Sequence, residues 1–183
     1  MQLSLKDTAG HSPCVAATTS FVSMWVEILL FLWNPSIRKF KMLPPLKNEL
    51  GRRPLCIYSF GFDPFIHGYK TIVVSFGTDK CEVSVHTVGT KCWRRIQDFP
   101  YHFYSISRSG IFVGGTVNWL AYDAQTSYLL AIVSLNLEKE SYQRLWQPCL
   151  KKHHYILGVL KDCLCMCESS ISSIVKCVLK FGL

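Results

Sequence analysis

A short pattern that occurs three times most constrains the fold of this chain. In each copy an aromatic residue is followed three positions later by an aliphatic residue and, soon after, by proline. The aromatic residues of successive copies are 53 and 49 positions apart. The copies are Phe40, Leu43 and Pro44; Trp93, Ile96 and Pro100; and Tyr142, Leu145 and Pro148. A chain that repeats itself at such a period is expected to fold as a series of similar units.

Each copy of the pattern ends a predicted β-hairpin. Apolar residues alternate in the strand before it, as at Val83 and Val85, and a short polar turn separates that strand from the aromatic residue. Between the hairpins lies a second recurring piece, an apolar strand opened by glycine, around Gly61, Gly114-Gly115 and Gly158. Each repeat is therefore expected to contain about four short strands.

Four strands in a repeat of about 50 residues are typical of the blades of kelch-type propellers. A single blade cannot bury both of its faces, so blades stack face to face around an axis. Large apolar residues such as Trp93 and Trp119 are then expected to fill the space between blades. The sequence predicts an all-β fold, a kelch-like partial β-propeller of repeated four-stranded blades.

The apolar run over residues 21–33 raises the alternative of a membrane segment or a signal peptide. The run has only 13 residues and contains Glu27, whereas a spanning helix needs about 20 apolar residues. It also begins too far from Met1 for a signal peptide, and no small-residue cleavage site follows it. We expect no membrane partner. Together with nine cysteines, this predicts reduced thiols and a cytoplasmic or nuclear location.

The net charge of +8 raises the question of nucleic acid as a partner. The basic doublets Arg52-Arg53, Arg94-Arg95 and Lys151-Lys152 are far apart, and no basic run or basic helix joins them. Phosphate binding needs several cations close together, so we expect a solvated surface and no nucleic acid partner. A basic nucleic-acid-binding β-domain is the alternative, and clustering of the two arginine doublets on one folded face would favour it.

No catalytic, cofactor or metal site is predicted. The sequence lacks the patterns Gly-x-Ser-x-Gly, His-Glu-x-x-His and Gly-x-Gly-x-x-Gly, and it has no P-loop. Cys163, Cys165 and Cys167 alternate, which places them about 6.6 Å apart on one face of a strand. Thiolates on one zinc ion lie less than about 4 Å from each other, so we expect these cysteines to be small buried residues.

Six segments, in this order, resemble the F-box associated interaction domain of plant F-box and F-box/kelch-repeat proteins. They are "LWNPSIRKFKMLPPL", "YSFGFDPFIHGYKTIVV", "CEVSVHTVGTKCWRRIQDFP", "SGIFVGGTVNWLAYD", "IVSLNLEKESYQ" and "LGVLKDCLCM". Together they cover residues 32 to about 166. The resemblance implies a propeller-like module that recruits a protein substrate to an SCF-type cullin ubiquitin ligase and has no catalytic activity of its own.

The chain also departs from the family pattern. Residues 1–31 contain nothing like an F-box, the helical segment that docks on a Skp-type adaptor. We expect an atypical N-terminal segment over 1–31, the F-box associated domain over 32–168 and a divergent tail over 169–183. The chain is expected to be a truncated family member that does not bind the adaptor. The alternative is a non-ligase fragment that is inert or competes for substrates.

The predicted partner-binding residues are Tyr101, His102, Phe103 and Tyr104. These four consecutive rings lie in a predicted loop between a hairpin and the next glycine-opened strand. Loops at the rim of a propeller commonly carry binding residues, and aromatic residues are frequent hot spots of protein interfaces. The alternative is that two of the four rings pack under neighbouring blades.

Overall fold

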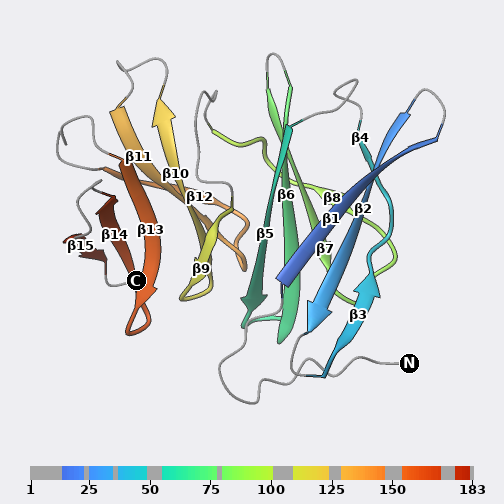
Figure 1. The fold of residues 1–183 in the computed structure, drawn as a ribbon, viewed down its shortest axis with the longest axis horizontal. Coiled ribbons are helices and arrows are strands. Elements are labelled where there is room, and N and C mark those ends of the chain that lie inside the picture. The colour runs from blue at the N-terminus through green and yellow to red at the C-terminus, as the bar shows by residue number, and fades with distance from the viewer. Residues whose placement is uncertain are drawn as a thin grey trace.

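The computed structural model describes residues 14–22, 25–34, 37–48, 55–77, 80–100, 109–123, 129–146, 154–169 and 176–181. Within these ranges all regular structure is β, as predicted. The strands form four antiparallel sheets, which we call A to D in chain order (Figure 1). Among the described residues, no helix is long and apolar enough to cross a membrane.

Each sheet is built from consecutive strands. Sheet A contains β1 (Cys14–Val22), β2 (Trp25–Asn34), β3 (Lys39–Met42) and β4 (Leu46–Asn48). Sheet B contains β5 (Leu55–Asp63), β6 (Gly68–Phe76), β7 (Cys81–Thr87) and β8 (Arg94–Arg95). Sheet C contains β9 (Ile111–Val113), β10 (Thr116–Asp123), β11 (Leu129–Asn136) and β12 (Tyr142–Trp146). Sheet D contains β13 (His154–Leu160), β14 (Cys163–Ser169) and β15 (Lys176–Phe181).

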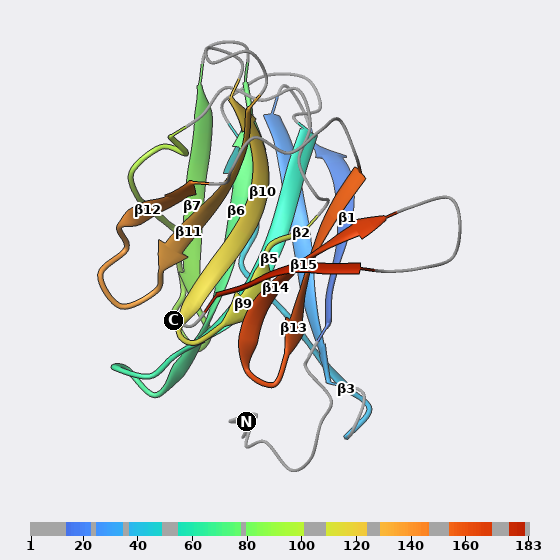
Figure 2. The ribbon, with the colours of Figure 1, turned by 90° about the vertical axis from the view of Figure 1, so that its left-hand side faces the viewer.

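The four sheets follow one another through space in chain order. Sheet A lies at the right of Figure 1 and sheet D at its left, and Figure 2 views the stack from the sheet D end. The first described strands of neighbouring sheets touch, since β1 contacts β5, β5 contacts β9, and β9 contacts β13. Sheets that meet along their first strands are arranged as the blades of a propeller are.

Apolar clusters fill the three spaces between neighbouring sheets. The space between sheets A and B is filled mainly by leucines of sheet A, and that between sheets C and D by aliphatic residues and Met166. The cluster between sheets B and C is the largest of the three and contains the fully buried Trp119. The prediction that Trp119 lies between blades is confirmed. Trp93 also lies between blades, with its indole N–H donating to Pro44 O over 2.7 Å.

The aromatic and the aliphatic residue of the repeated pattern lie on opposite faces of their sheet, in the same order in each sheet. Its aromatic residue faces the preceding sheet: Trp93 packs in the A–B cluster and Tyr142 in the B–C cluster. Its aliphatic residue faces the following sheet: Leu43 packs in the A–B cluster, Ile96 in the B–C cluster and Leu145 in the C–D cluster. Side chains alternate between the faces of a strand, so two residues three positions apart point in opposite directions.

The predicted hairpins are confirmed, whereas the predicted glycine-opened strands are only partly so. The hairpins are those of β2 with β3, β7 with β8, and β11 with β12. Gly114 and Gly115, with φ of 57° and 77°, form the tight turn that opens β10. Gly61 and Gly158 instead lie inside β5 and β13, so the prediction is wrong there. At Gly61 a Cβ atom would lie 2.6 Å from Phe112, and the strand needs glycine for this close contact.

The predicted domain boundaries stay predictions. In the structure β2 runs through the boundary placed between residues 31 and 32. Strand β15 lies in the segment predicted to be a divergent tail, and it pairs with β14 of sheet D. Both strands belong to sheets of the stack.

Candidate interaction face

Several turns of sheets B and C meet along one edge of the stack, the lower edge in Figure 1. They are the turns that join β5 to β6, β9 to β10, and β11 to β12 (Figure 1). Leu137 donates its backbone N–H to Gly115 O over 3.0 Å, and a Cβ atom at Gly115 would lie 3.8 Å from Pro64. The turns of the two sheets therefore contact each other.

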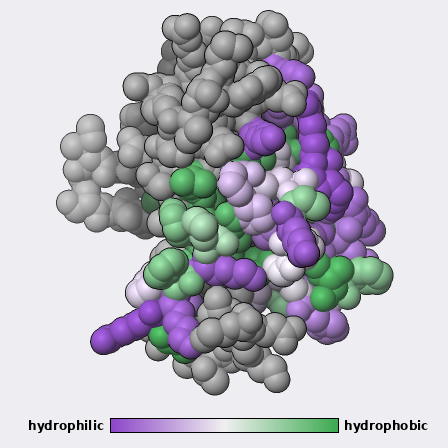
Figure 3. All heavy atoms as spheres, turned by 90° about the vertical axis from the view of Figure 1, so that its right-hand side faces the viewer, coloured by the Kyte–Doolittle hydropathy of each residue, from purple (hydrophilic) through white to green (hydrophobic). Residues whose placement is uncertain are grey.

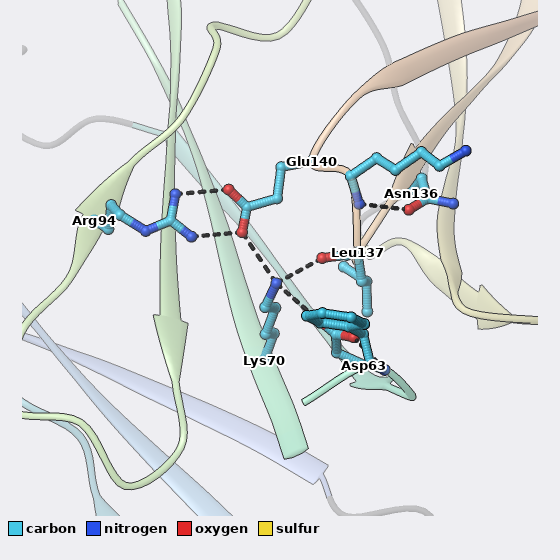
Figure 4. Close-up of polar contacts among 8 residues, drawn as sticks. Asp63, Lys70, Arg94, Asn136, Leu137 and Glu140 are labelled. Atoms are coloured by element: carbon cyan, nitrogen blue, oxygen red, sulfur yellow. Dashed lines mark hydrogen bonds and ion pairs between the residues drawn. The ribbon is translucent and has the colours of Figure 1, made fainter. Parts of the chain in front are cut away.

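A buried ion network lies beside these turns (Figure 4). Lys70 Nζ lies 2.8 Å from Asp63 Oδ2, and it donates to Leu137 O over 2.5 Å and to Glu140 Oε1 over 3.0 Å. The side chains of Lys70 and Asp63 are only 7% and 1% exposed. Asp63 and Lys70 belong to β5 and β6 of sheet B, whereas Leu137 and Glu140 belong to the β11–β12 turn of sheet C. The network therefore joins the two sheets.

Arg94 extends the network to the surface. Its guanidinium donates hydrogen bonds of 2.6 and 2.5 Å to the two carboxylate oxygens of Glu140, the bidentate geometry of strong arginine–carboxylate pairs. Hydrogen bonds from Arg94 and then Lys70 hold the pKa of Glu140 below its ordinary value, although partial burial opposes them. The hydrogen bonds to Glu140 raise the pKa of Arg94. Arg94 thus connects the start of β8 to Glu140 in the β11–β12 turn and, through Glu140, to Lys70.

The network also fixes the turn between β5 and β6. Asp63 Oδ1 accepts a hydrogen bond of 2.9 Å from the backbone N–H of Phe65, the contact by which aspartate commonly stabilises a turn. His67 closes the turn with a φ of 46°, just before Gly68. This conformation leaves Phe65 75% exposed and Ile66 44% exposed.

Phe65 and Ile66 form what we call the apolar tip. Exposed apolar residues are common singly, but these two are adjacent on a turn whose backbone is held by a buried carboxylate. A fixed backbone reduces the ordering cost of binding, and a phenylalanine offers a large apolar area to a partner. The apolar tip is therefore suited to insertion into an apolar depression on another protein.

The binding loop predicted from the sequence, Tyr101 to Tyr104, lies outside the described residues and stays a prediction. The apolar tip was missed. The sequence did carry a signal for it, because Asp63-Pro64 predicts a turn and two large apolar residues occupy the positions that follow. Turn positions are usually polar, so apolar residues there indicate exposed contact residues.

The basic doublets do not form a phosphate-binding surface in the part of the chain that is described. Arg94 is paired with Glu140, and Arg95 lies 2.7 Å from Glu82 and 2.8 Å from Asp98. The other doublets, Arg52-Arg53 and Lys151-Lys152, lie outside the described residues. Because both arginines of the described doublet are neutralised by carboxylates, this doublet offers little charge to a nucleic acid backbone.

Two of the three cysteines predicted to be buried, Cys163 and Cys165, have described side chains on β14. Cys165 is buried and Cys163 half-buried, and the side chain of Cys167 lies outside the described part. Burial raises the pKa of Cys81 to about 11, with a smaller contribution from Asp98, so this thiol is protonated at neutral pH. Among the described residues, no three potential ligands come together in a way that could hold a metal ion.

Comparison with known proteins agrees with this architecture. Residues 2–159 match the family model described as the F-box associated beta propeller domain. An F-box/kelch-repeat protein of Arabidopsis thaliana is 29% identical over 152 residues, which cover 77% of this chain and 41% of that protein. A putative F-box protein of the same plant is 26% identical over 149 residues, which cover 80% of this chain and 37% of that protein. The chain thus matches about two fifths of the length of these relatives.

Proposed function

Because this chain belongs to the F-box associated beta-propeller domain family, we propose that it is a protein-interaction module. In this role it holds a substrate protein for an SCF-type ubiquitin ligase, and the transfer of ubiquitin is left to other subunits. The relatives whose names carry the word F-box are the basis for the link to a ligase. The five cysteines whose side chains are described form no disulfide, which supports a cytoplasmic or nuclear setting.

The apolar tip is the observation that carries the proposal. Phe65 is 75% exposed although it is one of the largest apolar side chains of the molecule. The carboxylate that fixes its backbone is also the partner of a buried lysine. A folded chain that holds such a residue out in water gains no stability from it, so a binding role explains it better than a packing role.

The test measures which proteins become ubiquitinated in plant cells. The chain is fused to the F-box segment of one of its Arabidopsis relatives, and ubiquitin-modified peptides are quantified against cells that express the F-box segment alone. We expect a small set of proteins to gain ubiquitin. Phe65→Ser with Ile66→Ser should remove this gain, and should weaken binding of a purified substrate about 30-fold, the scale of an interface hot spot.

Leu55→Ser is the matched control. Leu55 is 72% exposed, close to the value for Phe65, but it lies at the other end of β5. The control should leave both the ubiquitinated set and the affinity unchanged. The proposal is wrong if the fusion adds no ubiquitin to any protein, or if the control and the double variant behave alike.

A further inference from the structure

The edge of the stack that carries the apolar tip also carries unpaired positive charge. The turns that follow β2, β5, β7, β9, β11 and β13 lie along the lower edge in Figure 1, and we call them the turn edge. Five exposed cations lie in these turns or at their ends: Arg38, Lys39, Lys91, Lys139 and Lys161. Within the described ranges, none of the five forms an ion pair.

Exposed cations elsewhere in the described sheets mostly have carboxylate partners. Lys80 and Arg95 both pair with Glu82, over 2.7 Å each. Among the side chains that the structure describes, Lys47 is the other exposed lysine without an ion pair. The free positive charge of the described residues is therefore concentrated at the turn edge.

Nearby carboxylates do not cancel this charge. The exposed Glu138 and Asp162 also belong to the turn edge, so its described part carries five exposed cations against two exposed carboxylates. The buried network beneath it contains Lys70 and Arg94 together with Asp63 and Glu140, and is neutral as a whole. The turn edge as a whole is therefore positively charged.

Two of the cations lie in turns that adjoin the turn of the apolar tip. The turn of Lys139 contacts it through Gly115, and the backbone N–H of Lys139 donates to Asn136 Oδ1 over 2.8 Å, which fixes that turn. The turn of Lys91 begins at Val88, whose N–H donates over 2.9 Å to the carbonyl of Tyr69, just after the tip. A partner that covers the tip therefore also comes close to these two lysines.

Apolar side chains are exposed among the cations along the turn edge. Ile37, beside Arg38, is 47% exposed, and Leu160, beside Lys161, is 54% exposed. Figure 3 views the molecule from the sheet A end, and it shows strongly hydrophilic and hydrophobic residues at the surface toward the lower edge. The turn edge thus offers apolar contacts and positive charge to the same partner.

This combination fits a protein better than a nucleic acid. A nucleic acid backbone is bound by cations gathered close together, whereas here carboxylates and aliphatic side chains lie between the cations. A protein surface can offer carboxylates to the lysines and an apolar depression to Phe65 and Ile66.

We propose that the turn edge binds an acidic protein surface, an apolar depression whose rim carries aspartate and glutamate. The proposal rests on the function proposed above and adds the chemistry of the substrate. The apolar tip fills the depression and supplies most of the affinity, as interface hot spots do. The lysines steer the acidic surface toward the tip, speed association and exclude basic proteins.

The first test selects binders of the tip from a library of a small folded scaffold with random surface residues. The whole chain is the target, and the double variant Phe65→Ser, Ile66→Ser removes clones that do not need the tip. The retained clones should contain more aspartate and glutamate, and less lysine and arginine, than the library. Retained clones of neutral or basic composition would overturn the proposal, and so would a failure to retain any clone.

Charge reversal then measures what the lysines contribute. Lys91→Glu and Lys139→Glu should each weaken binding of a retained clone about fivefold, mainly by slowing association, and high salt should reduce the loss. Lys47→Glu is the matched control. Lys47 is equally exposed, but it pairs in register with Glu27 near the start of β2, away from the turn edge, so the affinity should not change. Equal effects of all three variants, or binding that salt does not weaken, would contradict the proposal.

The second test returns to the fusion in plant cells. Lys91→Glu with Lys139→Glu should reduce the ubiquitin gained by the substrate proteins, and Lys47→Glu should not. If the change at the tip removes the gain but the lysine reversals do not, the proposed function stands and the acidic partner is wrong. If no form of the fusion adds ubiquitin, the proposed function is wrong, and the selected clones still decide which charge the turn edge binds.

Nucleic acid is the competing partner. The probes are a DNA duplex and poly-uridylate RNA, added to the purified whole chain. We expect both to bind more weakly than the retained clones. Binding of either probe as tightly as a clone, with the same loss on Lys91→Glu and Lys139→Glu, would assign the turn edge to nucleic acid and overturn the proposal.

Discussion

Lys70 has an unusual setting for a lysine, because its ammonium group is almost entirely removed from water. Desolvation of a charged group is costly unless good geometry and further hydrogen bonds compensate for it. Here Asp63, Glu140 and the carbonyl of Leu137 supply three acceptors, which equals the number of N–H groups of the ammonium. The lysine is therefore satisfied only when sheets B and C are in contact.

Replacing Lys70 by methionine should destabilise the protein by about 3–5 kcal/mol, because it leaves the buried Asp63 carboxylate without its partner. Lys80→Met is the control. Lys80 is 50% exposed and pairs with Glu82, and loss of an exposed pair costs about 0–1 kcal/mol. Urea unfolding of both variants measures the difference. Equal losses in the two variants would show that the buried network contributes no more than a surface pair.

His86 gives a second prediction at this scale. It is 1% exposed, packs 5.2 Å from the ring of Trp93, and has Nε2 3.2 Å from Thr90 O. Burial, and to a lesser degree the charge of Lys41, lowers its pKa below the ordinary 6.5, although the Thr90 contact opposes this. As the pH falls below 6.5, His86 becomes protonated in the unfolded chain before it does so in the folded chain. The free energy of unfolding should therefore fall as the pH falls.

His86→Gln should reduce this loss of stability. The measurement is the free energy of unfolding at several pH values between 7.5 and 5 for the wild type and the variant, using the linkage of proton uptake to stability. The variant should show the shallower slope. Identical slopes would mean that His86 does not contribute to the acid sensitivity of the fold.

Single residues were predicted from the sequence where the repeat determines their setting. Trp119 and Trp93 were placed between blades correctly because stacked sheets bury the large apolar residues of the faces that meet. The pairing of Lys70 with Asp63 and Glu140 was not predictable. Glu140 is 70 positions from Lys70, and only the packing of sheet B on sheet C brings them together.

At the scale of strands and turns, the alternation of apolar residues and the turn residues were enough to predict the hairpins. The hairpin after β7 was predictable because Gly89 supplies the positive φ that its turn needs. The need for glycine at position 61 was not predictable, because it arises from contact with sheet C and not from β5 itself. Phe112 and Leu137 of sheet C occupy the space where a side chain at this position would lie.

Gly61→Ala should therefore separate sheets B and C locally. The added methyl group would lie 2.6 Å from Phe112 Cδ2 and 2.7 Å from Leu137 Cδ1, and overpacking of this kind costs about 1–3 kcal/mol. Gly158→Ala is the control, since no atom lies within 4 Å of its added Cβ. It should be neutral or stabilise by up to about 1 kcal/mol. Thermal unfolding compares them, and an equal effect of both changes would contradict the close contact at Gly61.

At the scale of the whole molecule, the sheets differ in how many neighbours they have. Among the described residues, sheets B and C are each packed on both faces, whereas sheets A and D each have one packed neighbour. In a stack where each unit contacts only the next, the terminal units open first.

Hydrogen exchange should show this difference. In dilute protein, the amides of β6, β7, β10 and β11 should exchange slowest, and those of β2 and β14 faster. Exchange followed by mass spectrometry at several concentrations provides the measurement. Uniform protection across all four sheets would show that the stack unfolds as one cooperative unit instead.

Because the aromatic residue of each repeat and its aliphatic companion face opposite ways, the two faces of every sheet differ and the stack has a polarity. Every internal junction joins the same two kinds of surface, so the sheets are interchangeable in principle, as the units of a polymer are. Removal or duplication of one complete repeat, 49 to 53 residues long, would leave each junction matched in kind. A shorter insertion within a strand would reverse the side chains beyond it whenever its length is odd. Relatives should therefore differ in length by whole repeats, and a sheet cut from one of them should be accepted between two sheets of another.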